Sequence, residues 1–267
     1  MTARPDIDAV TALVARVADT IVAPRFRDLR HGDVREKSPG DLVTVVDTEA
    51  EAALVAGLAE IAPGVPVIGE EAAHARPATL DLLSAPRVWV VDPVDGTQAF
   101  VDGVPDYAVM VGLVEGGEAV AGWICLPEHG EMLVAERGAG AFRNGARLRR
   151  ESPPSALADL RGGLAIRSTP EDVHRWATGF GPGVTTGRQW SGYHYAEVAL
   201  GREDFLVYRR TWPWDHVPGA VLLREVGGVS RRLDGTEYRP GVALDGLLAA
   251  ADDATYRIVA EHLAGRL

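Results

Sequence analysis

Four apolar segments lie close together between Val88 and Leu148, and they constrain the fold of this chain more than any other feature. The segments are VWVVD, YAVMVGLV, AVAGWICL and EMLVAE, each of strand length. The turns between the last three carry glycine, at 115–117 and at 128–130. Short apolar runs joined by glycine-bearing turns are typical of antiparallel strands. We therefore expect an antiparallel meander in this part of the chain.

Two helical patterns precede these strands. From Asp6 to Ala23, apolar residues recur at steps of three and four, which is the spacing of one helix face, and Pro24 should end that helix. A second helix should follow Asp47, for which N-capping is the simplest role, and should stop at 63–64, Pro-Gly. Helices followed by a meander indicate an α+β first half.

The pattern changes after about Arg150. The segment Ser-Pro-Pro-Ser at 152–155 is the best linker candidate. Beyond it, strand-like and helix-like segments alternate, which is typical of an α/β unit with helices on the sheet faces. The strand-like segments are GGLAIRS, FLVY, GGVSRRL and GLLAAA, and the helix-like ones lie near 170–178, 192–200, 215–226 and 253–264. We expect an α+β domain over 1–150 and an α/β domain over 151–267.

The acidic composition argues against several classes of partner. The 267 residues include 27 basic and 38 acidic side chains, for a net charge of −11. A nucleic-acid coat or a binder of anionic membranes needs a basic surface, so neither partner is expected. No apolar run approaches the ~20 residues that span a bilayer. Asp6 and Asp8 interrupt the stretch that a signal peptide would need, and the one cysteine cannot form an internal disulfide, so we expect a cytoplasmic protein.

The segment from Trp89 to Thr97 joins an apolar strand to two carboxylates. Asp92 and Asp95 lie three positions apart at the strand end, and Gly96 allows a ligand to approach closely. Two converging carboxylates stay ionised only beside a cation, and their hard oxygen atoms suit Mg²⁺. The amides of Gly96 and Thr97 could bind an anion if a helix starts there. The alternative is a solvated turn, for which D-P-x-D-G is favourable chemistry.

Three more segments place acids at strand ends or helix starts. Glu70 and Glu71 follow an apolar strand, Asp47 precedes a helical pattern, and Asp215 opens a helix. Each has a simpler explanation as a residue that favours a helix N-terminus. Together with the pair after Trp89, they could form one metal site.

In this order, the segments resemble the inositol monophosphatase superfamily of Mg²⁺-dependent, lithium-sensitive phosphatases. The resemblance rests on D-L-V-T-V-V-D at 41–47, G-E-E at 69–71, W-V-V-D-P-V-D-G-T-Q-A-F at 89–100, and W-D-H-V-P-G with E-V-G-G between 214 and 228. It covers nearly the whole chain. It implies a layered αβαβα architecture, with an antiparallel sheet in the first half and a mixed sheet in the second. It also implies a homodimer whose active sites lie between the two halves of each chain.

The resemblance assigns a role to each acidic segment. Two or three Mg²⁺ ions would be held by the carboxylates of Asp47, Glu70, Asp92, Asp95 and Asp215 and by the carbonyl of Val94. Thr97, paired with Asp47, would orient the attacking water, and Glu70 would complete the catalytic set. Gly96 and Thr97 would bind the phosphate. The implied reaction is hydrolysis of a phosphate monoester by metal-activated water, without a phosphoenzyme.

Substrate choice is where the chain departs from the family pattern. Tyr208 stands where inositol phosphatases typically carry a glutamate, and the stretch 188–195, with Trp190 and Ser191, replaces a G-S/T-A-type run. With Asp95 and Asp215, these residues are the expected substrate contacts, although the aromatic ones could instead be core or dimer contacts. Aromatic residues beside Arg209 and Arg210 would suit a flatter, larger or more anionic leaving group.

Several substrates therefore stay open. The leading expectation is inositol monophosphate or a related cyclitol or sugar phosphate. Histidinol phosphate, fructose 1,6-bisphosphate and 3′-phosphoadenosine 5′-phosphate are alternatives within the same chemistry. A regulatory module that keeps the fold and binds a protein partner is an alternative of another class.

Other polar or reactive residues have structural explanations. Cys125 should be a small buried hydrophobe, and His194 a hydrogen-bonded structural histidine. Arg147, Arg149 and Arg150 are expected on a solvated face.

Overall fold

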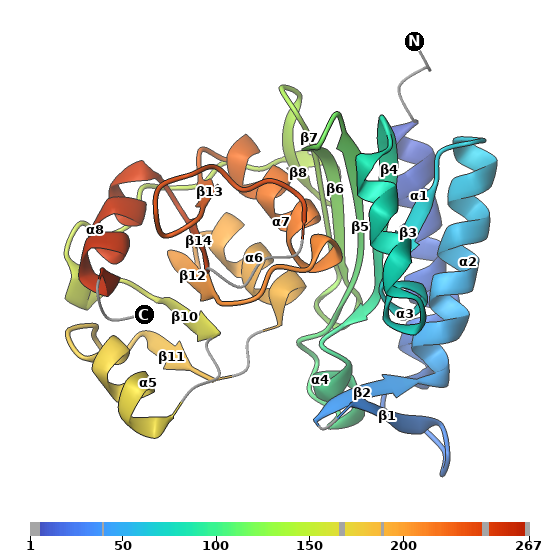
Figure 1. Ribbon diagram of the computed structural model, residues 1–267, viewed down its shortest axis with the longest axis horizontal. Coiled ribbons are helices and arrows are strands. Elements are labelled where there is room, and N and C mark those ends of the chain that lie inside the picture. Colours follow the sequence, from blue (N-terminus) through green and yellow to red (C-terminus); the bar gives the residue numbers. More distant parts are fainter. Residues whose placement is uncertain (1–5, 39, 166–168, 188–189, 242–245, 265–267) are drawn as a thin grey trace.

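The computed structural model describes residues 6–38, 40–165, 169–187, 190–241 and 246–264, and these form five layers in the order helix, sheet, helix, sheet, helix (Figure 1). The outer layers are α1 (Ile7–Val17) with α2 (Val45–Ile61), and α5 (Pro170–Ala177) with α8 (Asp253–Leu263). The middle layer is α6 (Ser191–Ala199) with α7 (Pro213–Glu225). The expected αβαβα architecture is confirmed.

The first sheet has seven strands in the order β3-β4-β5-β6-β7-β8-β9. They are β3 (Val67–Gly69), β4 (Arg87–Asp95), β5 (Ala108–Glu115), β6 (Glu118–Leu126), β7 (Glu131–Glu136), β8 (Gly140–Arg143) and β9 (Ala146–Arg147). From β4 onward every pairing is antiparallel, which confirms the meander, whereas β3 pairs with β4 in parallel. Alternate side chains of β4 enter different cores, because Trp89 packs with α1 and α2 and Val90 with the middle helices.

The second sheet is mixed, as expected. Its order is β11-β10-β12-β14-β13, with β10 parallel to both neighbours and β14 antiparallel to both of its own. The strands are β10 (Gly162–Ala165), β11 (Val184–Thr186), β12 (Phe205–Tyr208), β13 (Val229–Arg231) and β14 (Leu247–Ala250). The edge strand β11 was not expected from the sequence, because its three residues include two exposed threonines and give no apolar run.

The first of the two expected helices starts after Asp6 and the second stops before 63–64, as expected, but the end of the first and the start of the second differ from the expectation. Asp6 caps α1, which gives way after Val17 to a π-helical turn (Ala18–Val22) and a 3₁₀ turn (Ala23–Arg25). The expectation that α2 follows Asp47 is wrong. Thr44 is the N-cap and Asp47 is the third helical residue, and the two exchange hydrogen bonds in a capping box.

Short elements complete the first half. They are the hairpin of β1 (Val34–Ser38) and β2 (Asp41–Thr44), the one- to two-turn helices α3 (Glu70–Ala75) and α4 (Thr97–Val101), and the 3₁₀ helices Pro77–Ser84 and Pro127–His129. In Figure 1 the hairpin and α4 lie together at one end of the first sheet. Among the described residues, no helix is long and apolar enough to cross a membrane.

One buried cluster between the sheets joins side chains from both halves, including Val90 and Val217. The domain boundary near Arg150 stays a prediction. The expectation that Arg150 is solvated is wrong: its side chain is 3% exposed and pairs at 2.8 Å with the fully buried Asp204. It also donates to the Val198 carbonyl at 2.8 Å. This ion pair ties the segment after the first sheet to the start of β12. Arg147 and Arg149 are exposed, as expected.

Candidate active site

Three carboxylates converge where β4 meets the start of α7. Asp92 and Asp95 come from the end of β4, and Asp215 from the first turn of α7. One oxygen atom of each lies within 4.8 Å of the others. Three positions along a regular strand would put Asp92 and Asp95 on opposite faces. The pairing register of β4 with β5 shifts between them, and this irregularity turns both side chains to the same site.

The electrostatics of this cluster call for a cation. Burial, followed by the charges of Glu70 and Asp95, raises the pKa of Asp92 well above its ordinary value. Burial likewise raises the pKa of Asp215 well above its ordinary value, and that of Asp95 to about 6. The Oδ1 atom of Asp92 is buried and has no hydrogen-bond partner among the described residues. Because buried acids without donors are costly, this set fits a hard divalent ion such as Mg²⁺.

Ser191 and Gly192 hold Asp95 in place. The Ser191 hydroxyl donates to Asp95 Oδ1 at 2.7 Å, and the Gly192 amide donates to Oδ2 at 2.8 Å. These donors start α6, so the negative carboxylate lies at a helix N-terminus, where it is favoured. Their hydrogen bonds lower the pKa of Asp95 and partly offset the effect of its burial.

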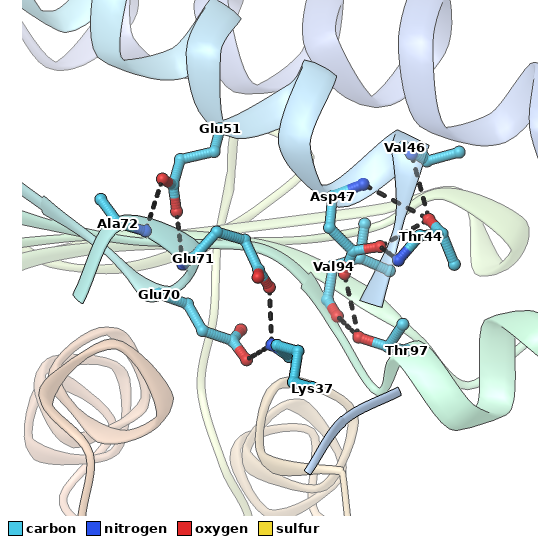
Figure 2. Close-up of polar contacts among 10 residues, drawn as sticks. All are labelled: Lys37, Thr44, Val46, Asp47, Glu51, Glu70, Glu71, Ala72, Val94 and Thr97. Atoms are coloured by element: carbon cyan, nitrogen blue, oxygen red, sulfur yellow. Dashed lines mark hydrogen bonds and ion pairs between the residues drawn. The ribbon is translucent and has the colours of Figure 1, made fainter. Parts of the chain in front are cut away.

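A second unit pairs Thr97 with Asp47 (Figure 2). The Thr97 hydroxyl lies 3.0 Å from Asp47 Oδ1 and 3.0 Å from the Val94 carbonyl, and its single proton can be donated to only one of them at a time. Asp47 is fully buried and accepts from the Thr44 amide at 2.8 Å. Burial raises the pKa of Asp47 to about 6, although the hydrogen bonds from Thr44 and Thr97 oppose that shift.

Lys37 joins two acids on the other side of the site (Figure 2). Its ammonium lies 2.8 Å from Glu70 and 2.7 Å from Glu71, and its side chain is only 5% exposed. Burial lowers the pKa of Lys37, but the two ion pairs outweigh it and the net shift is upward. The pKa of Glu71 rises to about 8, first through burial and then through the charge of Glu70.

Glu51 fixes the start of α3. Its carboxylate accepts from the amides of Glu71 at 2.8 Å and Ala72 at 3.0 Å (Figure 2). A Cβ at Gly69 would lie 2.3 Å from the Glu51 carboxylate, so a larger residue there would displace that carboxylate. Glu51 therefore sets the direction in which Glu70 leaves the strand.

These groups line or adjoin one pocket of about 570 Å³. The predicted site residues that line it are Glu70, Asp92, Val94, Asp95, Gly96, Thr97, Trp190 and Asp215. Asp47, Ser191 and Tyr208 do not belong to the described lining. Asp47 and Ser191 support lining residues through Thr97 and Asp95. Tyr208 lies in a buried aromatic group, 4.8 Å from the His216 ring, and its hydroxyl has no partner among the described residues.

The predictions for His194, for Cys125 and for the stretch before Trp190 complete the comparison with the sequence. His194 contacts Glu203 at 2.9 Å through Nδ1, in agreement with a structural role, and Cys125 is buried. Positions 188 and 189 of the stretch before Trp190 lie outside the described residues.

Sequence reasoning missed three features of the site. Lys37 is the chain's one lysine, a signal that a search for acidic motifs passes over. Glu51 carries no motif, because its partners are backbone amides on another element. Trp212 and Trp214 form an aromatic wall of the pocket, with ring centroids 5.2 Å apart and planes 7° apart.

Comparison with known proteins places this geometry in a class of phosphatases. The sequence profile of the Inositol monophosphatase family matches residues 4–265, so the chain belongs to the inositol monophosphatase family. A fructose-1,6-bisphosphatase/inositol-1-monophosphatase of Thermotoga maritima is 32% identical over 206 residues, 76% of each chain. An inositol-1-monophosphatase of Bacillus subtilis is 32% identical over 210 residues, 76% of this chain and 77% of the relative.

Another relative bears a different name. The Nus factor SuhB of Escherichia coli is 29% identical over 229 residues, 82% of each chain. Among solved structures, an inositol monophosphatase of Thermotoga maritima has a TM-score of 0.78 at 26% identity and covers 97% of this chain and 98% of its own. Family and structural neighbours indicate a phosphatase.

Proposed function

We propose that this chain hydrolyses phosphate monoesters of small alcohols in a Mg²⁺-dependent reaction by direct attack of water. The observation that carries the proposal is the convergence of Asp92, Asp95 and Asp215, with a buried oxygen on Asp92 that has no partner in the described part of the chain. A structural cluster of acids would satisfy its oxygens with donors, whereas a metal site leaves them free for the ion.

The metal set would comprise Asp92, Asp95, Asp215, Glu70 and the Val94 carbonyl, with Asp47 near a weaker third ion. Bound Mg²⁺ would lower the pKa of the attacking water and would stabilise the negative charge on the leaving oxygen. Glu70 already lies beside a cation, Lys37, which compensates its charge when no metal is bound.

Thr97 is suited to orient the attacking water. With its proton donated to Asp47 Oδ1, the Thr97 oxygen presents its lone pairs to the pocket that it lines. A water that donates a hydrogen bond to the Thr97 oxygen keeps a lone pair on its own oxygen for attack on phosphorus. The position of the phosphate then determines the direction of that attack. Asp47, which is not among the described lining residues of the pocket, would hold the hydroxyl in that orientation.

The Gly96 and Thr97 amides would contact the phosphate. Gly96 has φ 82°, a left-handed conformation that other residues seldom adopt, and it is the N-cap of α4. A Cβ at Gly96 would lie 3.2 Å from Trp190 Cγ. The turn is thus closed on one side by Trp190.

The substrate we propose is inositol monophosphate or another small phosphorylated alcohol, with histidinol phosphate, fructose 1,6-bisphosphate and 3′-phosphoadenosine 5′-phosphate as alternatives. Relatives named for inositol phosphate and fructose bisphosphate hydrolysis support that range. Phosphate release from these four compounds, with and without Mg²⁺, tests it. We expect turnover of at least one that requires Mg²⁺ and is abolished in Asp92→Asn. No Mg²⁺-dependent turnover on any of them would overturn the proposal.

A regulatory function is the second candidate, because a relative at 29% identity is named a Nus factor. Affinity capture with wild-type protein and with Asp92→Asn separates the two functions. A stoichiometric partner retained by both, together with absent turnover, supports the regulatory function. Turnover without such a partner supports the phosphatase.

Three further properties belong to the same proposal: inhibition by lithium, a homodimer, and a cytoplasmic location. Lithium should lower Mg²⁺-dependent phosphate release, since it would compete for one of the metal positions. Light scattering of the purified chain measures its oligomeric state, and fractionation of the source cells measures its location.

A further inference from the structure

We propose that Arg210 forms a second anion subsite in the same pocket, so that the enzyme selects phosphate monoesters whose alcohol carries another phosphate or a carboxylate. The inference rests on the proposed phosphatase function and narrows its substrate class.

Arg210 is a free cation in an acidic pocket. It lies between β12 and α7, five positions before Asp215, and is the one arginine among the described residues that line the pocket. Its side chain is exposed, and no carboxylate of the described residues pairs with it. The chain has 38 acidic side chains, and five of the residues that line the pocket are acids. None of the described acids pairs with Arg210 even in these surroundings, so its guanidinium is available to an anionic ligand.

An aromatic surface holds the guanidinium. Its carbon lies 5.5 Å from the centroid of the Trp212 ring, whose other neighbour is the parallel ring of Trp214. Such cation–π contacts restrict the guanidinium and leave its N–H groups at the edge free. Arginine binds phosphate and carboxylate through two parallel N–H groups, and a restricted guanidinium loses less entropy in doing so.

The backbone of Arg210 is tied to the helix that carries Asp215. His216 Nε2 lies 3.2 Å from the Arg210 carbonyl, which can only accept, so Nε2 is the donor. His216 Nδ1 lies 3.1 Å from the Tyr195 hydroxyl, which in turn fixes the ring. Because His216 directly follows Asp215, this hydrogen bond holds the Arg210 backbone next to the helix turn that carries Asp215.

One ligand can reach both. The pocket of about 570 Å³ is of the size that holds a single small metabolite. The phosphate to be cleaved would lie at the acids and Thr97, and the second anionic group at Arg210. Of the four proposed substrates, fructose 1,6-bisphosphate and 3′-phosphoadenosine 5′-phosphate carry a second phosphate. Inositol monophosphate and histidinol phosphate do not, so the subsite favours the first two.

The test compares Arg210→Gln with Arg209→Gln, a neighbouring exposed arginine that does not line the pocket. The kcat/KM is measured on fructose 1,6-bisphosphate, 3-phosphoglycerate and inositol 1-phosphate, which carry a second phosphate, a carboxylate and no second anion. We expect Arg210→Gln to lower kcat/KM on the first two about 10- to 100-fold more than on the third, mainly through KM. Losses on only one of the two would identify which anion the subsite takes.

Equal losses on all three substrates, or equal behaviour of the two variants, would overturn the subsite. A calorimetric titration with fructose 1,6-bisphosphate, with Ca²⁺ in place of Mg²⁺ to suppress hydrolysis, measures binding to the subsite independently of turnover. We expect binding to weaken about tenfold or more in Arg210→Gln and to stay at the wild-type level in Arg209→Gln. If no compound is hydrolysed, the phosphatase proposal fails, and this binding measurement still decides the subsite.

Discussion

The hydroxyl of Thr97 lies 3.0 Å from Asp47 Oδ1, although fifty positions separate the two residues in the chain. The contact joins the first turn of α4 to the first turn of α2, and both helices start at the same end of the first sheet (Figure 1). It therefore makes the orientation of the Thr97 hydroxyl depend on a residue from another layer.

Replacing Thr97 tests whether its hydroxyl acts in the reaction. Thr97→Ala should lower kcat by about 10²-fold and change KM less. This is the lower end of the range for loss of a side chain that orients or deprotonates the attacking water. Thr97→Ser keeps the hydroxyl and should retain most of the activity. Steady-state phosphate release measures both variants. Equal activity of Ala and Ser variants would show that the hydroxyl does not act in the reaction.

The stability of the metal-free protein should fall as the pH rises from about 4 to 7. The pKa values of Asp47 and Asp95 are about 6 in the folded chain, against an ordinary value of 3.8. Between these values the native state binds protons that the unfolded chain has released, so its free energy of unfolding decreases with pH. Denaturant unfolding with a chelator measures the slope, and saturating Mg²⁺ should reduce it. A metal-free stability that rises over this range would contradict the assignment.

Asp92→Asn should stabilise the metal-free protein at pH 8. The substitution removes one buried negative charge from the cluster without changing the side-chain shape, and the gain should be about 1–3 kcal/mol. At pH 5 the gain should shrink, since the raised pKa of Asp92 means that a lower pH favours its neutral, protonated form in the wild type. Thermal unfolding at both pH values provides the measurement. In excess Mg²⁺ the order should reverse, because only the wild type binds the ion fully.

Removing Lys37 should have the opposite effect. Lys37→Met leaves Glu70 and Glu71 without their buried cation, which should cost about 3–5 kcal/mol at pH 8 in the absence of metal. Lys37→Arg should recover part of that loss. Near pH 5 the penalty should be smaller, because the pKa of Glu71 is about 8 and its carboxyl is then protonated. A Lys37→Met protein as stable as wild type at pH 8 would show that the ion pairs contribute nothing.

The Arg150–Asp204 pair offers a test away from the site. Among the described residues, Arg150→Met leaves the fully buried Asp204 carboxylate with only the exposed Arg161 as a cationic partner, and it should destabilise the fold by about 3–5 kcal/mol. Arg149→Met, at an exposed neighbour, should stay within about 0.5 kcal/mol. Urea unfolding compares the two. Similar effects of both substitutions would place Arg150 outside the buried network.

The sequence predicted most where local chemistry determines structure. The meander follows from strand-length apolar runs and glycine turns, and the joint position of Asp92 and Asp95 from their place at a strand end. It could not show the register shift that puts both on one face, since that depends on pairing with β5. It also misjudged Arg150, because a buried ion pair between residues 54 positions apart leaves no local pattern.

The sequence also could not predict the N-cap of α2 or the direction of the Tyr208 side chain. Thr44, not Asp47, is the N-cap of α2, and the two are hard to separate by type because both accept hydrogen bonds from helix N-termini. Tyr208 was expected at the substrate by its position in the family pattern, yet its ring packs against Tyr195 and His216 in the described structure. A position in sequence does not say which way a side chain turns.

Titration of the metal-free protein with Mg²⁺ in a calorimeter tests the central claim most directly. The three proteins to compare are wild type, Asp92→Asn and Asp172→Asn. Asp172 lies on the outer helix α5 and serves as the control. We predict saturable Mg²⁺ binding to wild type and to Asp172→Asn, and affinity at least about 10²-fold lower in Asp92→Asn. Equal binding to all three proteins, or none to the wild type, would contradict a metal site at Asp92, Asp95 and Asp215.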